Sequence, residues 1–306
     1  MQLICPCATV RWLVRDTFRQ ARACGIFWVL LGVSALCTAL CLTATVAAPD
    51  HGTHGTGRLG LAFGLLEVPF DQGPAAAVRN LELQLAGWVA DAVGLLLALL
   101  WTASFLPTFL EPGAIAVLLA KPVPRWQLLV GKFAGVLAFV ALQAVVFVAG
   151  TWLALGLRTG VWDAVYFLCV PVLLLHFAIF FSFSAMLAVA TRSTVACVFG
   201  SAVFWLLCWG LNFGRHAALV VPELRATSPS FGRALEWTYW AAPKPLDFHL
   251  LLLQTFGAED VFGGLVNVPA LTAQNVWAPG WSVLSSVLCA VVLLALTAYD
   301  FLTADY

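Results

Sequence analysis

Charged residues are scarce in this sequence. Of its 306 residues, 15 are Lys or Arg and 15 are Asp or Glu, so charged residues make up 10%, against ~25% in a typical globular protein. Hydrophobic residues make up 62%, and the mean hydropathy is +0.96. Too few charges remain to cover a water-soluble surface, so most of the chain is expected to face hydrocarbon. The net charge of zero also excludes the basic surface of a nucleic-acid-binding protein.

The sequence also lacks a phosphate-binding loop of its own. A Walker A loop needs a glycine, four further residues and then Gly-Lys-Ser/Thr, which together hold a nucleotide phosphate. The one candidate, Gly131-Lys132, has Trp126 at the first glycine position and Phe133 in place of the hydroxyl residue. We therefore expect no catalytic residue, no bound cofactor and no ATP on this chain.

Long runs without charge are abundant, by contrast. Six runs have 19 or more uncharged residues, close to the ~20 residues that a helix needs to cross a ~30 Å hydrocarbon core. The strands of a membrane barrel would instead alternate over about ten residues. The sequence therefore predicts an all-α integral membrane protein in one domain. The six spans are expected at residues 26–48, 88–110, 133–157, 165–190, 194–213 and 281–300.

The positions of Lys and Arg predict the orientation. With both chain ends in the cytoplasm, the inner segments hold eight basic residues and the first two outer loops hold three, which agrees with the excess of basic residues in cytoplasmic loops. The last outer loop, residues 214–280, is too long for its charges to decide the orientation. The first outer loop is expected at residues 49–87.

The first 25 residues precede an apolar run of 23 residues, which is longer than the core of a signal peptide. They are expected to form a cytoplasmic helix before an uncleaved first span. Its arginines recur at helical spacing on one face, with apolar residues opposite. Such a helix can lie in the membrane interface with its arginines toward anionic head groups, or it can be only the basic flank of a span. The arginines are Arg11, Arg15, Arg19 and Arg22.

The segment between the second and third spans, residues 111–132, is the most informative. Glu111-Pro112-Gly113 ends the second helix, since proline breaks the hydrogen-bond pattern and glycine accepts the turn. Residues 114–120 then form about two helical turns, too short to span, and two prolines in residues 122–124 stiffen the chain after this helix. A simple reversal of the chain needs only about 2 to 8 residues. We therefore expect a rigid apolar helix that docks a cytoplasmic partner.

These motifs resemble the permease subunits of ABC-type exporters, specifically the type-2 permeases that include those linked to multicopper-enzyme maturation. The resemblance extends to the N-terminal helix, the six spans and the large last outer loop; the long first outer loop departs from a minimal permease. The resemblance implies that the residues on which it rests contact the ATPase. These residues are Glu111, Gly113, Leu118, Leu119, Lys121, Pro122, Arg125, Gly131 and Lys132.

The resemblance implies a transporter that uses ATP-Mg bound to a separate ATPase subunit. It further implies a dimer with a second copy or a similar permease, in a membrane expected to be the bacterial cytoplasmic (inner) one. A non-transporting membrane scaffold for a maturation or assembly complex is the alternative. A secondary transporter is less consistent, because we find no internal repeat and no carboxylate in the interior of a predicted span. Asp91 is expected at the outer interface, where it stays hydrated.

Polar side chains inside the spans either line a translocation path or hydrogen-bond neighbouring helices. The candidates are Gln143, His176, Ser182, Ser184 and Asn212.

Two histidines and nine cysteines raise the questions of a metal site and of disulfide bonds, and their positions favour neither. His51 and His54 lie in a glycine-rich outer loop without a third ligand nearby, so a solvated loop explains them better than a metal site. All nine cysteines fall in predicted spans or on the cytoplasmic side, which excludes an external disulfide framework. In the last outer loop, residues 250–253 suggest a short re-entrant or interfacial helix.

Overall fold

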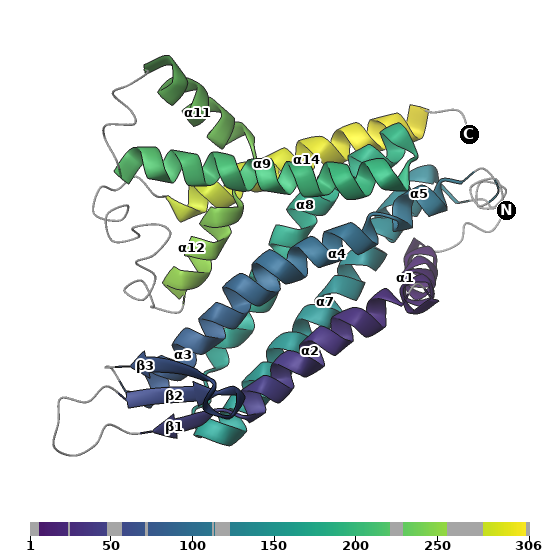
Figure 1. The fold of residues 1–306 in the computed structure, drawn as a ribbon. Coiled ribbons are helices and arrows are strands. Elements are labelled where there is room, and N and C mark those ends of the chain that lie inside the picture. The colour runs from purple at the N-terminus through teal and green to yellow at the C-terminus, as the bar shows by residue number, and fades with distance from the viewer. Residues whose placement is uncertain are drawn as a thin grey trace.

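The computed structural model describes residues 6–23, 25–47, 57–70, 73–111, 113, 123–220, 229–255 and 278–303. These residues form a bundle of long helices with one small β-sheet at one end (Figure 1). Helices α1 (Pro6–Ala23) and α5 (Phe105–Phe109) lie at the other end. We refer to the two ends as the sheet end and the α1 end of the bundle.

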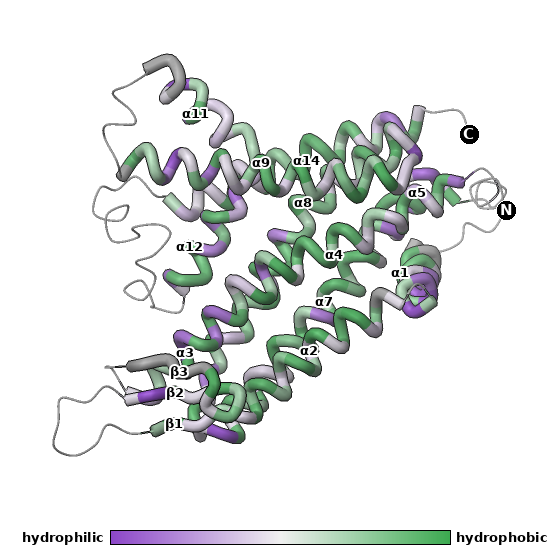
Figure 2. The backbone as a smooth tube through the Cα atoms, in the orientation of Figure 1, coloured by the Kyte–Doolittle hydropathy of each residue, from purple (hydrophilic) through white to green (hydrophobic). Residues whose placement is uncertain are grey.

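Among the described residues, five helices are long and apolar enough to cross a membrane. They are Pro74–Phe109, α7 (Arg125–Thr159), Ala164–Thr191, α9 (Thr194–Val220) and α14 (Pro279–Thr303). A sixth is obtained if α1 and α2 (Ile26–Leu42) count as one span that bends by 74°. Hydrophobic residues run along most of these helices, and hydrophilic ones gather mainly toward the two ends (Figure 2). The prediction of an all-α integral membrane protein is confirmed, with the small sheet as an addition.

The second span begins earlier than the sequence predicts. Its helix starts at Pro74 rather than at residue 88 and continues through α3 (Pro74–Gln84), the π-helical segment η2 (Leu85–Gly94), α4 (Leu95–Thr102) and α5. Charged Arg79 and Glu82 hid this first part from a search for uncharged runs. The expectation that residues 49–87 form one loop is therefore wrong for residues 74–87.

A three-stranded antiparallel sheet stands before this helix. Its strands β1 (Thr45–Ala47), β2 (Gly57–Leu61) and β3 (Leu66–Phe70) lie in that order, with Leu59 opposite both Val46 and Val68. The Leu59 side chain is fully buried among Cys41, Val78 and other residues of the helices beneath. Burial of this strand residue fixes the sheet against the bundle.

Helix α1 packs along the first turns of α7. Gly131 and Gly135 lie one helical turn apart on α7, and a Cβ at either position would collide with Leu13 or Thr17 of α1. The four-residue spacing of two glycines lets the two backbones approach closely. Because α7 begins at Arg125, Gly131 and Lys132 belong to a membrane helix. The expectation that the loop extends to residue 132 is wrong.

The segment expected as the last outer loop also contains helices. Helix α9 extends to Val220, and it is followed by α11 (Pro229–Ala241) and α12 (Pro245–Thr255). Helix α12 contacts α8 (Cys169–Thr191), α9, α14 and η2, and Leu250, Leu252 and Leu253 are buried. The short helix predicted at residues 250–253 therefore exists as part of α12, and it packs into the bundle.

We expect the close contact of α1 with α7 to depend on the absence of a side chain at residue 135. In Gly135→Ala, the new Cβ would lie 2.6 Å from Thr17 Oγ1, so α1 has to move and the midpoint of thermal unfolding falls. Gly210→Ala is the matched control, because Gly210 is exposed on α9 with nothing within 4 Å of its Cβ position; there alanine favours the helix. An equal effect of both substitutions on the unfolding midpoint would contradict this packing.

Candidate functional site

Lys132 connects three elements at the α1 end. Its ammonium lies 2.8 Å from Gln20 Oε1 and 3.3 Å from Asp16 Oδ2, both on α1, although its side chain is only 1% exposed. It also lies 5.9 and 5.7 Å from the ring centroids of Phe105 and Phe109 on α5. A buried ammonium needs such partners. Lys132 therefore joins α7 to α1 and to the helix that precedes the predicted docking loop.

The other residues predicted to contact an ATPase lie around this point or outside the described chain. Arg125 begins α7 and donates a hydrogen bond of 3.4 Å from Nη1 to the carbonyl oxygen of Leu302 on α14. Glu111 and Gly113 are exposed after α5. The described residues thus place both flanks of the loop at the α1 end. The predicted helix 114–120, which includes Leu118 and Leu119, lies outside the described residues. Lys121, Pro122, His51 and His54 lie outside them as well.

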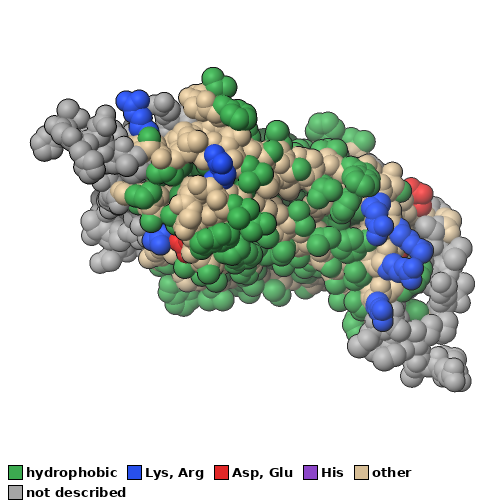
Figure 3. Space-filling model, turned by 90° about the horizontal axis from the view of Figure 1, so that it is seen from below, with side chains coloured by type: hydrophobic (Ala, Val, Ile, Leu, Met, Phe, Trp, Pro, Cys, Tyr) green, Lys and Arg blue, Asp and Glu red, His purple; other side chains and the backbone are tan. Residues whose placement is uncertain are grey.

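The predicted basic face of α1 is present. Its four arginines are exposed, whereas Leu13, Thr17 and Ala21 are buried against the bundle. Blue side chains gather at this end of the molecule (Figure 3). The apolar side of α1 contacts protein, so its arginines are free to face water or lipid head groups. The four are Arg11, Arg15, Arg19 and Arg22.

The polar residues predicted inside the spans are buried but do not form one path. Gln143 donates a 3.5 Å hydrogen bond to the carbonyl oxygen of Phe27, and Ser182 bonds the carbonyl oxygen of Ile179 on its own helix. Ser184 and Asn212 are each 1% exposed. Gln143 lines a cavity between α2, α7 and the second span, whereas His176 lines a different one. Gln143 and Ser182 thus hydrogen-bond backbone carbonyl oxygens, whereas His176 lies beside Asp91 in a separate pocket.

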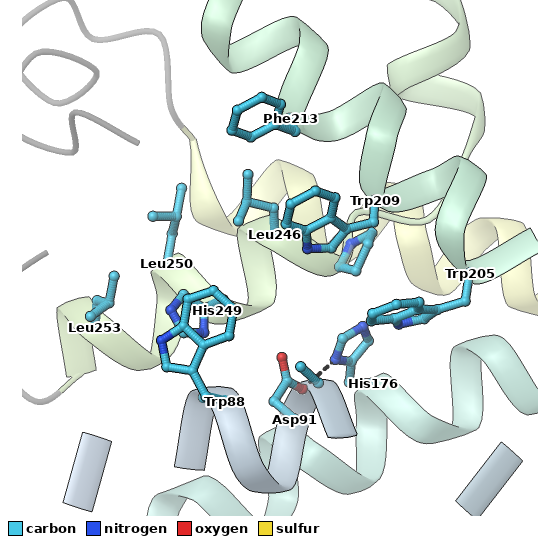
Figure 4. A pocket seen from close by; sticks show the side chains of 13 residues that line it. Trp88, Asp91, His176, Trp205, Trp209, Phe213, Leu246, His249, Leu250 and Leu253 are labelled. Carbon is cyan, nitrogen blue, oxygen red and sulfur yellow. Dashed lines mark hydrogen bonds and ion pairs between the residues drawn. The ribbon is translucent and has the colours of Figure 1, made fainter. Parts of the chain in front are cut away.

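This site is a pocket between the second span, α8, α9 and α12. Its walls are mostly aromatic and apolar, and its space, which includes the open mouth, is about 600 Å³. Figure 4 shows tryptophans from two elements around it, with Asp91 and His176 at its base. The lining residues are Gly87, Trp88, Asp91, Ala92, His176, Trp205, Trp209, Phe213, Pro245, Leu246, His249, Leu250 and Leu253.

Asp91 pairs with His176 at the base of the pocket. One carboxylate oxygen lies 2.5 Å from His176 Nδ1, and the two side chains are 5% and 1% exposed. The imidazole stacks on Phe248 with ring centroids 4.8 Å apart, which fixes its orientation. The expectation that Asp91 stays hydrated at the outer interface is wrong, because residues 74–90 extend the helix beyond it.

Sequence reasoning missed the other members of this site. Asp91 and Trp88 lie in the π-helical segment, and such segments often mark functional sites. In the sequence, Gly87 is a sign of close packing against another element. The structure shows the cause, since His249 of α12 occupies the space that a side chain at residue 87 would need. Burial lowers the pKa of His249 below its ordinary value, so this imidazole is neutral at pH 7. A further carboxylate, Glu82, is also fully buried in α3.

A second polar cluster holds α12 in place. Asp247 of α12 lies 2.7 Å from His216 Nε2 on α9 and accepts a 2.6 Å hydrogen bond from the Tyr239 hydroxyl on α11. That hydroxyl also lies 3.1 Å from Ser282 Oγ on α14. Burial raises the pKa of Asp247, but the hydrogen bond and charge of His216 outweigh it, so the pKa lies below its ordinary value. These bonds connect four helices beside the pocket.

Arg215 and Lys244 complete this cluster. Arg215 makes two hydrogen bonds of 3.1 Å to the Glu236 carboxylate, and its guanidinium lies 3.9 Å from the centroid of the Tyr239 ring. Lys244 donates to Ser285 Oγ at 2.6 Å and lies 4.7 Å from the same ring centroid. The cluster thus pairs its buried charges internally and positions the α12 residues that line the pocket.

No group of three or more His, Cys, Asp or Glu that could hold a metal ion occurs among the residues that the structure describes.

The charge of Lys244 is expected to make stability depend on pH. Burial lowers the pKa of its ammonium from 10.5 to about 8, so between these values the unfolded chain binds a proton that the folded chain does not. Folded stability therefore rises with pH in this window. Between about pH 8 and about pH 10, the unfolding midpoint of the wild type should rise relative to that of Lys244→Met.

Arg233→Met is the control for this measurement, since Arg233 is exposed on α11 and an arginine keeps its charge throughout. The difference in unfolding midpoint between Arg233→Met and the wild type should not change with pH. A constant difference for Lys244→Met as well would show that Lys244 keeps an ordinary pKa.

The comparison with protein families agrees with this arrangement. The profile of the ABC-2 family of transporter proteins matches residues 12–306, which is nearly the whole chain. The comparison with curated proteins gave no match. Since the matched region includes α7, the pocket and the spanning helices, the chain belongs to the ABC-2 family of transporter proteins and is a permease of the ABC-2 type.

Proposed function

We propose that this chain is the membrane subunit of an ATP-driven exporter, and that a separate ATPase subunit docks at the α1 end. The loop that follows α5 contacts the ATPase, and a second copy of the chain or a similar permease completes the transporter. The α1 end then faces the cytoplasm, which in this proposal is that of a bacterium. A link to multicopper-enzyme maturation is supported only by the motif between the second and third spans.

The contacts of Lys132 are the observation that carries this proposal. The docking loop connects α5 to α7, and Lys132 of α7 lies beside Phe105 and Phe109 of α5 and binds Asp16 of α1. Arg125 further joins the start of α7 to the end of α14. A force on the loop therefore acts on several helices together, because packed interiors transmit displacement. The proposed ATPase needs such a connection to move the spans.

Docking through the loop can be tested by co-purification. We expect Leu118→Asp with Leu119→Asp and Arg125→Ala to abolish the recovery of an ATPase that carries a Walker A motif, because charged residues cannot enter an apolar groove. Phe63→Asp with Leu65→Asp is the matched control, since these apolar side chains are 91% and 86% exposed near the sheet end. Recovery of the ATPase with the loop variant would exclude docking at this loop.

Transmission can be separated from docking with Lys132→Met. This variant keeps the loop and therefore should still recover the ATPase, but it removes the ammonium that binds Asp16 and Gln20. We expect the permease-dependent rate of ATP hydrolysis to change by about 2- to 30-fold, the range of typical coupling energies. An unchanged rate with unchanged docking would show that Lys132 does not transmit the motion.

The alternative of a non-transporting scaffold predicts a different result in sealed vesicles. A scaffold retains its partners but moves no solute when ATP is added, whereas the proposed exporter accumulates its substrate on one side only when ATP is present. The buried pocket favours the exporter, since a scaffold does not require a carboxylate inside its membrane helices.

A further inference from the structure

We propose that the pocket between η2, α8, α9 and α12 binds an apolar organic cation, with the Asp91 carboxylate as its counter-ion. This inference rests on the proposed function in that it names a substrate class for the exporter. The site is built from side chains of four separate elements, and Figure 4 shows them converging on one space. The charges around Lys132 and around Asp247, by contrast, are paired within the protein.

The charge of the pocket is the first argument. Among the described residues that line it, Asp91 is the one carboxylate and there is no Lys or Arg, while burial lowers the pKa of the His249 imidazole. His176 Nε2 is buried and has no hydrogen-bond partner among the described residues. A positively charged imidazole would leave an N–H donor unpaired there, which is costly in a buried site. A neutral His176 that donates its Nδ1–H to Asp91 fits better.

Within the described chain, the hydrogen bond found for the Asp91 carboxylate is thus the one to His176, at the base of a mostly apolar pocket. A buried carboxylate usually has a cationic partner or several donors. Here the second carboxylate oxygen points away from His176 (Figure 4). A ligand with a positive charge would supply the missing counter-charge.

The walls supply the second argument. Trp88 and Trp209 line the pocket from the second span and from α9, with Phe213 one turn beyond Trp209. Aromatic faces attract cations, tryptophan most strongly, and the attraction is greater where water is excluded. The remaining lining residues from α12 are Pro245, Leu246, Leu250 and Leu253. These walls cannot replace the hydration shell of an inorganic ion, whereas they suit an organic ammonium with apolar substituents.

The pocket is also accessible, because the space of about 600 Å³ beside Asp91 includes an open mouth through which a small organic ligand can enter. One competing feature is Trp205 Nε1, a buried donor without a partner among the described residues, which would suit an acceptor or an anion. Comparing ligands of opposite charge and similar shape decides between them.

The test uses the purified full-length chain in an uncharged detergent, without an ATPase, and follows the tryptophan fluorescence. The probe is benzyltrimethylammonium; phenylmethanesulfonate has a similar shape and the opposite charge, and neopentylbenzene is the uncharged isostere. We expect saturable binding of the ammonium alone. In Asp91→Asn its Kd should rise by at least about tenfold, as expected for the loss of a desolvated charge pair.

Asp300→Asn is the matched control, because Asp300 is exposed near the end of α14, and its Kd should equal that of the wild type. Trp209→Leu, which leaves Asp91 and His176 in place, should weaken binding as well. If Asp91→Asn does not fold, two measurements still test the inference. They are the comparison of the three probes on the wild-type protein and the Kd of the ammonium for Trp209→Leu. Equal binding of the anion or of the uncharged isostere, or an unchanged Kd in a folded Asp91→Asn, would overturn the inference.

The results of this binding test can be distinguished from those of the docking test of the proposed function. Loss of ATPase docking with retained cation binding would contradict the proposed function alone. Retained docking without cation binding would contradict the pocket assignment alone.

Discussion

Three buried charged side chains of this bundle each pair with a residue of another element, because the hydrocarbon around them offers no partner. Asp91 of η2 pairs with His176 of α8, and Asp247 of α12 pairs with His216 of α9. Lys132 of α7 pairs with Asp16 of α1. These pairs lie where helices that are distant in sequence meet. The requirement for partners thus explains much of how the helices are placed.

The pair at Lys132 and the pair at Asp91 have different consequences. At the α1 end, Lys132 has partners on two elements beside the predicted docking loop, so its charge is fully used within the protein. At the pocket, Asp91 has one neutral partner and an open space beside it. A charge with all its partners stabilises a contact, whereas a charge with too few is available to a ligand. This difference separates a transmitting role from a binding role.

Much of the fold could be predicted from where the charges are absent. Uncharged runs located the long helices, and the spacing of Arg11, Arg15, Arg19 and Arg22 predicted the exposed face of α1. The same method missed the first part of the second span, because Arg79 and Glu82 interrupt its uncharged run. It also missed the pocket, since the residues that line it beside Asp91 come from α8, α9 and α12. Pairing between distant segments leaves no periodic signal in the sequence.

In the proposed transporter, ATPase docking at the α1 end and ligand binding in the pocket are coupled. The most direct test measures the Kd of benzyltrimethylammonium in the complex of permease and ATPase, with and without a non-hydrolysable ATP analogue. Two sites that are coupled must change each other's affinity. The account predicts a different Kd when the analogue is bound, and a smaller difference in the Lys132→Met complex. The same Kd with and without the analogue would contradict it.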